Sequence, residues 1–128
     1  ASSFDRMGYN MEGIVDRLKS MIQENVFFSD RAVKEVNDIF QEAMDLLENI
    51  PDLIVTQDKP LAQHIGEQVR SVFKIANGYS EEHEERLIQG VCTPKSSPLY
   101  LGILESLKGI IGHTLEVSGK IVSLSSKS

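Results

Sequence analysis

Hydrophobic residues recur at alternating intervals of four and three along four separate stretches of the chain. Residues at this spacing fall on one side of an α-helix and cannot line one face of a β-strand. The first stretch predicts a helix over residues 4–25, in which Gly8 and Gly13 weaken the helix without ending it. Its inward-facing stripe consists of Met7, Met11, Ile14, Leu18 and Met21.

A second helix is predicted over residues 30–55. Ser29 is a suitable N-cap residue, and Asp30 places a negative charge near the positive end of the helix. Pro51 removes a backbone hydrogen bond, so we expect a kink or a stop near Ile50. The predicted inward-facing stripe consists of Val33, Val36, Phe40, Ala43, Leu47, Ile50 and Ile54.

A third helix is predicted over residues 59–89, because Asp58 and Pro60 form a helix start and Gly90 a helix stop. Its inward-facing stripe is Leu61, Ile65, Val69, Val72, Ala76, Tyr79, His83 and Leu87.

A fourth helix is predicted over residues 98–124, with Ser97 as N-cap and Pro98 in the first turn. It carries two neighbouring stripes and should be the most buried helix. The first is Tyr100, Leu104, Leu107, Ile111, Thr114, Ser118 and Ile121, and the second is Ile103, Ile110, Val117 and Leu124.

The predicted fold is all-α, an antiparallel up-down bundle of about four long helices. Short loops between consecutive helices force neighbours to run antiparallel. No run of residues alternates with a period of two, and no hairpin turn sequence occurs. We therefore expect residues 1–128 to form a single domain, and we expect this domain to be a fragment of a longer protein.

Charge and cysteine content narrow the possible partners. The net charge of -6 disfavours nucleic acid and anionic membranes, which need a concentrated basic surface. Cys92 is the single cysteine, so an intrachain disulfide is excluded and a reducing compartment is favoured. No run reaches the roughly 18 to 20 hydrophobic residues that a membrane-spanning helix requires.

One acidic segment is a candidate metal site. Glu81, Glu82, His83 and Glu85 could collect a divalent cation, and the alternative is a solvated helix face on which Glu82 pairs with Arg86. Cys92 has no histidine at short spacing that could act as its base. Because no nucleophile motif or phosphate-binding loop occurs, the sequence does not indicate an enzyme.

Several segments resemble one family of helical domains. The sequence FDRMGYN (residues 4–10) is similar to the helix signature of PhoU-like proteins, and LKGIIGH (residues 107–113) has the corresponding place in the fourth helix. Residues 28–29, 82–87, 90–94 and 100–101 also resemble the C-terminal PhoU-like domain of bacterial sodium/phosphate cotransporters. The order and spacing of these segments hold over residues 4–124.

This resemblance implies a cytoplasmic domain built from three-helix repeats, which follows the membrane part of an inner-membrane phosphate transporter and regulates it. PhoU-like signatures carry an acidic residue and an aspartate four positions later, and these bind iron, zinc or other metals. Here the corresponding positions are Asp5 and Tyr9 in the first helix, and Lys108 and Gly112 in the fourth. Three of the four lack a carboxylate, so we expect this metal site to be lost.

The leading hypothesis is thus a non-enzymatic regulatory or interaction domain of a sodium-dependent phosphate transport protein, without a cofactor. Its partner would be the transmembrane part of the same transporter, a partner protein, or a second copy in a homodimer formed by helix packing. The alternative is a metal-binding sensor of phosphate homeostasis that uses the acidic cluster around His83.

Overall fold

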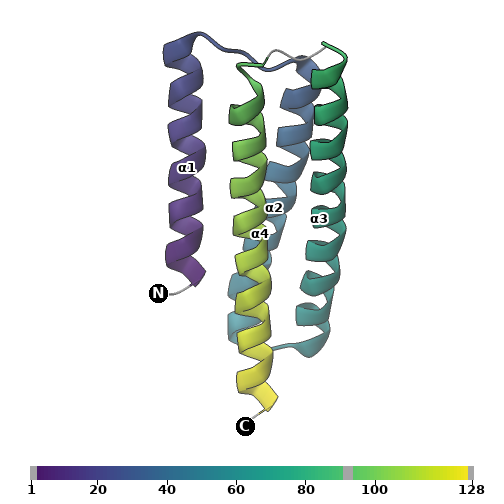
Figure 1. Cartoon of the computed structure of the whole chain (residues 1–128). Coiled ribbons are helices and arrows are strands. Elements are labelled where there is room, and N and C mark those ends of the chain that lie inside the picture. The colour runs from purple at the N-terminus through teal and green to yellow at the C-terminus, as the bar shows by residue number, and fades with distance from the viewer. Residues whose placement is uncertain (1–2, 91–93, 127–128) are drawn as a thin grey trace.

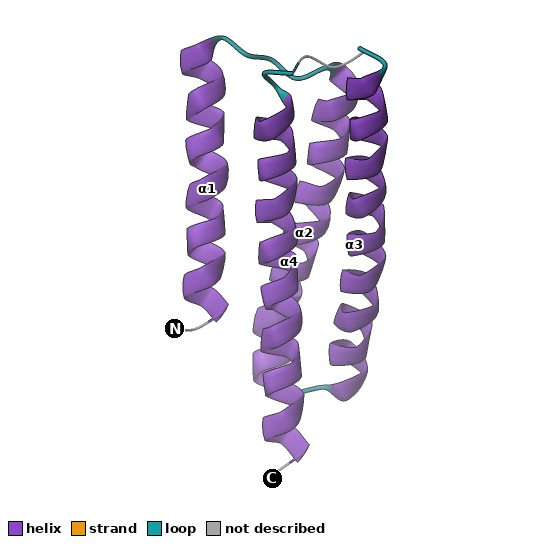
Figure 2. Ribbon diagram, viewed as in Figure 1, coloured by secondary structure: helices purple, strands orange, loops and turns teal. Residues whose placement is uncertain are grey.

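The computed structural model describes residues 3–90 and 94–126, which form four long helices. They are α1 (Ser3–Glu24), α2 (Asp30–Thr56), α3 (Lys59–Ile88) and α4 (Ser97–Ser126), and they run alternately up and down (Figure 1). Within the described ranges there is no strand (Figure 2). The predicted all-α helical bundle is confirmed, and the four predicted helices agree with the observed ones to within about two residues at each end.

The helix ends follow local sequence signals. The Ser29 hydroxyl accepts a hydrogen bond of 3.2 Å from the Ala32 amide, as expected of an N-cap. Gly90 follows the last turn of α3 with φ of 77°, a left-handed conformation that glycine adopts without strain. Ser97 was predicted to cap α4 but lies inside it, and the first backbone hydrogen bond runs from the Tyr100 amide to the Ser96 carbonyl oxygen.

Helix α4 lies at the centre of the bundle, where it contacts each of the other three helices (Figure 1). Both of its predicted stripes are buried up to Ile121, and the Leu124 side chain lies outside the described part of the chain. A helix that is apolar over two adjoining stripes is suited to this position, because it can bury more than one face. The prediction that the fourth helix is the most buried agrees with its central place.

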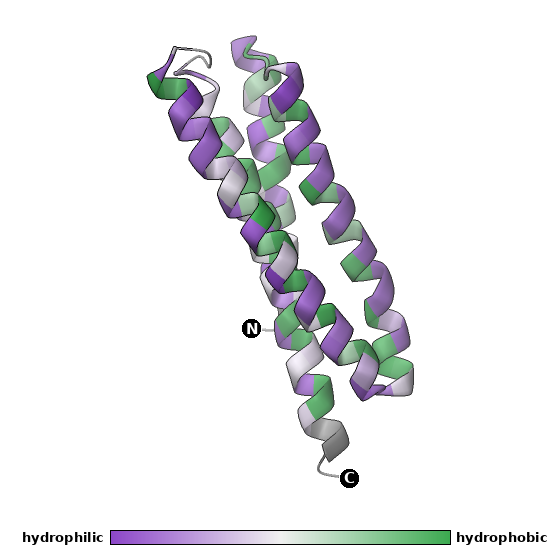
Figure 3. Ribbon diagram, turned by 90° about the vertical axis from the view of Figure 1, so that its right-hand side faces the viewer, coloured by the Kyte–Doolittle hydropathy of each residue, from purple (hydrophilic) through white to green (hydrophobic). Residues whose placement is uncertain are grey.

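Helix α2 is rotated relative to the sequence prediction. Its buried stripe is Ala32, Glu35, Ile39, Ala43, Leu46, Ile50 and Leu53. Of the predicted stripe, Ala43 and Ile50 are buried, whereas Val33, Phe40 and Ile54 are exposed. The prediction was wrong because α2 carries two adjacent hydrophobic stripes, and helical spacing alone does not determine which of them faces the core. Figure 3 shows that hydrophobic and hydrophilic residues are interspersed along the helices.

Pro51 does not end α2, which continues to Thr56. The ring removes one amide donor, but the helix on either side of it is held by the burial of Ile50 and Leu53. The expected stop near Ile50 is therefore absent. The helix ends instead at Gln57, whose φ of 50° and ψ of 34° are left-handed and whose amide donates to the Leu53 carbonyl oxygen.

Helix α1 stands at the edge of the bundle and packs against α4 (Figure 1). Glycines allow the close approach: a Cβ atom added to Gly109 would lie 2.5 Å from Nδ2 of Asn10, and one added to Gly102 would collide with the Arg17 guanidinium. Among the described residues, no Cα atom of α1 comes within 8 Å of α2 or α3. The four helices are thus a three-helix bundle of α2, α3 and α4, with α1 attached to one side of α4.

Over the described residues, none of these helices contains a segment whose length and hydrophobicity would suit a bilayer-spanning helix.

Candidate functional site

A hydrophobic groove runs between α1 and α2, with α4 as its floor. Its volume is about 340 Å³. Leu18 and Phe40 lie on opposite walls and are 46% and 44% exposed. The lining is hydrophobic apart from one amide side chain, and it consists of Ile14, Leu18, Met21, Phe28, Val33, Val36, Asn37, Phe40, Ile103 and Leu107. This groove is the candidate functional site, since a contiguous exposed hydrophobic surface usually marks a binding surface.

The groove arises from the same sequence feature that rotates α2. Val33 and Phe40, which belong to the second hydrophobic stripe of α2, remain 45% and 44% exposed. The outer side of α1 presents Met11, Val15 and Ile22, which are likewise exposed. The predicted inward position of Met11 and Leu18 is therefore wrong, since both are about half exposed. Of the exposed hydrophobic residues on these two helices, Leu18 of α1 and Val33 and Phe40 of α2 also line the groove.

A buried polar cluster lies at the end of the bundle where α3 ends and α4 begins. Arg86 Nη2 donates to Glu35 Oε1 at 2.7 Å, and the Tyr100 hydroxyl donates to the same oxygen at 3.1 Å. The His83 ring stacks on Tyr100 with centroids 4.4 Å apart, and its Nε2 lies 3.0 Å from the Ser97 hydroxyl oxygen. The cluster therefore connects α2, α3 and α4 through side chains that are all buried.

Burial shifts the pKa values of His83 and Tyr100 in this cluster. Removal from water lowers the pKa of His83, and the positive charge of Arg86 lowers it further. Burial also raises the pKa of Tyr100, with the Glu35 charge and its hydrogen bond acting in the same direction. At neutral pH the tyrosine stays protonated and acts as a hydrogen-bond donor to Glu35, so the cluster holds the helices together through fixed partners.

The groove and the polar cluster are adjacent. Phe28 lines the groove, and its ring meets the Tyr100 ring edge-on with centroids 5.8 Å apart. The aromatic pair separates the hydrophobic lining of the groove from the charged groups behind it. Through Phe28 and Tyr100, the end of the groove nearest the α1–α2 loop is connected to the hydrogen-bonded cluster that reaches α3.

The side chains of the acidic segment, which the sequence predicts as a candidate metal site, lie in different environments. His83 is buried against Tyr100, as its place in the inward stripe predicted. Glu82 forms an ion pair of 2.7 Å with Arg31 of α2, not with Arg86. Glu85 is exposed, and Glu81 borders a hollow beside Lys74 of α3. Over residues 3–90 and 94–126, no three His, Cys, Asp or Glu side chains come together as metal ligands would.

The four signature positions also occupy separate surroundings. Lys108 Nζ binds Glu105 at 2.6 Å and Asn77 of α3 at 3.0 Å, and Gly112 faces the Phe73 ring of α3. Asp5 and Tyr9 are exposed on α1, where Tyr9 borders a small polar hollow against α4. Cys92 lies outside the described residues.

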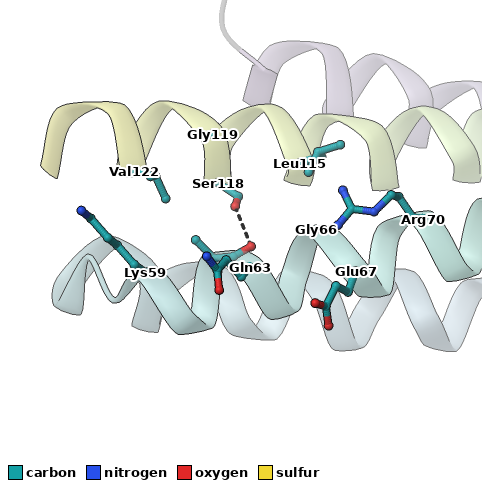
Figure 4. A pocket seen from close by; sticks show the side chains of 10 residues that line it. Lys59, Gln63, Gly66, Glu67, Arg70, Leu115, Ser118, Gly119 and Val122 are labelled. Carbon is teal, nitrogen blue, oxygen red and sulfur yellow. Dashed lines mark hydrogen bonds between the residues drawn. The ribbon is translucent and has the colours of Figure 1, made fainter. Parts of the chain in front are cut away.

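A second, more open groove of about 640 Å³ lies between α3 and α4 near the other end of the bundle (Figure 4). Lys59 and Arg70 lie at its two ends, three helical turns apart, and Glu67 lies between them in sequence. The Ser118 hydroxyl is already engaged with the Ala62 carbonyl oxygen at 3.4 Å. We assign no ligand to this groove, because its charged groups are exposed and do not converge on one point.

Glu35 and Arg86 were not identified from the sequence as a functional or structural pair. A usable signal existed: Glu35 lies on the stripe with Ala32 and Ile39, three and four residues away, and a charge among core positions implies a buried partner. The neighbouring stripe of α2 is more hydrophobic and therefore looks like the core-facing one in the sequence. Arg86 was instead assigned to a surface pair with Glu82.

Comparison of the chain with protein-family models, with curated proteins and with solved structures gave no match. The resemblance to PhoU-like domains therefore stays a prediction from the sequence.

Proposed function

We propose that this chain is a regulatory or interaction domain and not an enzyme, and that it binds an amphipathic helix in the groove between α1 and α2. The observation that carries the proposal is the hydrophobic lining of that groove, which is open to solvent between Leu18 and Phe40. Helices that dock in such grooves present hydrophobic residues at helical spacing to a surface of this kind.

The resemblance of residues 4–124 supports a more specific setting. On this proposal the domain belongs to a bacterial sodium/phosphate cotransporter, lies on the cytoplasmic side of the inner membrane, and regulates phosphate uptake through contact with the membrane part or a partner protein. Helix α1 would close one three-helix repeat and α2, α3 and α4 would form the next. The division of the bundle into α1 and a compact three-helix unit is consistent with that organisation.

Uptake measurements test this function. Phe40→Glu places a charge on the wall of the groove, and we expect it to change sodium-dependent phosphate uptake by cells that express the full-length protein several-fold. Ile88→Glu is the matched control, because Ile88 is 86% exposed at the end of α3, away from the groove. Equal uptake by the two variants, at equal protein levels, would contradict the regulatory role.

A further inference from the structure

We propose that the helix bound in the groove is α1 of a second copy of this chain, so that the domain forms a symmetric antiparallel dimer. This inference rests on the proposed role of the groove as a helix-binding site. It names the occupant, and three observations support it: a heptad-like stripe on α1, charges of opposite sign at its rim, and the size of the uncovered face.

The outer side of α1 has the spacing of a coiled-coil helix. Met11, Val15, Leu18 and Ile22 are separated by four, three and four residues, and all four side chains are exposed. This stripe adjoins the groove that α1 itself helps to form. The chain thus carries a hydrophobic ridge and a hydrophobic groove side by side, which is the arrangement that a two-fold symmetric interface requires.

The exposed charges beside the stripe indicate how the α1 helices of the two copies would be aligned along their length. An antiparallel second copy that places its Ile22 against Met11 also places its Leu18 against Val15. Glu12 directly follows Met11, and Lys19 directly follows Leu18. Both are exposed, and because they are seven residues apart they lie on the same side of the hydrophobic stripe. In this register Glu12 lies beside Lys19 of the second copy, and the two-fold axis generates the pair twice.

The size of the face suits a stable dimer. Helix α1 has 22 residues, so the face shared by α1 and α2 is about 33 Å long and two helix diameters, roughly 20 Å, wide. Covering it in both copies would bury on the order of 1,300 Å², within the range of specific protein interfaces. The exposed side chains of α2 that would flank the docked helix include Val33, Phe40 and Met44.

Sedimentation equilibrium of the full 128-residue chain over a concentration series tests the proposal. We expect a reversible monomer–dimer equilibrium, and we expect Leu18→Glu to weaken it by about 100-fold or more, because it buries an unpaired charge in the interface. Ile88→Glu should leave it unchanged. Circular dichroism checks that both variants keep their helix content, as expected for exposed positions.

Charge reversals test the register. Glu12→Lys alone should weaken the dimer by roughly tenfold, since two attractive pairs become repulsive, and adding Lys19→Glu should restore it. A dimer that Leu18→Glu does not weaken, or one that the double reversal does not rescue, would overturn the proposed interface.

A chain that stays monomeric at every concentration would overturn the second copy as occupant. It would leave the groove to a different helix, whose importance the uptake assay on Phe40→Glu measures independently. The two proposals therefore fail separately.

Discussion

The ion pair between Glu35 and Arg86 is a charged contact in the interior of the bundle. Glu35 is 3% exposed and Arg86 is 7% exposed. Oε2 of Glu35 has no hydrogen-bond partner among the described residues, so this carboxylate depends on the two donors that reach Oε1. A buried pair of this kind contributes little net stability when intact, yet the loss of one partner is costly because the other charge remains buried.

We accordingly expect Arg86→Met to lower the free energy of unfolding by about 3–5 kcal/mol. The double variant Glu35→Leu with Arg86→Met should recover most of this loss, because no uncompensated charge remains. Denaturant titration followed by circular dichroism measures both values. If the double variant were as unstable as the single one, the pair would contribute to stability by more than mutual compensation of its two charges.

His83 makes the stability of the fold depend on pH. Its pKa is lowered in the folded chain by burial and by Arg86, despite opposing attraction from Glu35 and Glu84. The unfolded chain binds a proton near the ordinary histidine pKa of about 6.5, so acidification favours the unfolded state. The stabilising effect is complete above that pH and is lost as the pH falls below it.

The unfolding free energy should therefore decrease between about pH 7 and pH 5, and His83→Gln should remove part of this decrease. His64→Gln is the control, because His64 is exposed on the same helix. Urea titrations at several pH values provide the measurement. If the two variants show the same pH dependence, the buried position of His83 has no influence on its protonation.

The number and positions of the α-helices followed from the sequence, whereas the rotation of α2 about its own axis did not. The spacing of hydrophobic residues requires helices, and Ser29 and Gly90 fix two of their ends through backbone geometry that is local to the chain. Which stripe of α2 faces the core depends on how well its side chains pack against those of α4. This packing exists only in the assembled bundle and cannot be read from the spacing of residues in one helix. The groove was not predicted for the same reason, since it exists only because one stripe of α2 remains uncovered.

The contact between α1 and α4 involves Gly102 and Gly109 of α4, and Gly109 is the position at which an added Cβ atom meets Asn10. Gly109→Ala gains helix propensity of up to about 1 kcal/mol, but the new Cβ atom lies 2.5 Å from Nδ2 of Asn10, which must move. Because the atoms that the new Cβ meets all belong to the end of the partly exposed Asn10 side chain, we expect the gain and the cost to cancel to within about 0.5 kcal/mol.

Gly119→Ala is the matched control on the same helix, since nothing lies within 4 Å of its added Cβ atom. It should stabilise the fold by about 0.5–1 kcal/mol. Thermal unfolding of both variants compares them directly. Equal stabilisation by the two alanines would mean that Asn10 relaxes without cost.

The four helices are buried to different extents: Met7 is the only buried side chain within residues 5–24 of α1, whereas α2 buries seven residues and α3 eight. At low protein concentration we expect amide hydrogens of α1 to exchange faster than those of the other three helices. Hydrogen exchange read by mass spectrometry resolves the four helices. Uniform protection would show that α1 and the three-helix unit open together.

The central position of α4 has a consequence for biosynthesis. Since α4 follows the other three helices in the sequence, a ribosome releases α1, α2 and α3 before the helix that they surround is complete. Until then their hydrophobic stripes have no common partner, and the emerging chain depends on chaperones or on weak local contacts. Nascent chains stalled before all of α4 (residues 97–126) has left the ribosome should therefore be protease-sensitive, whereas chains from which the whole of α4 has emerged should be protected.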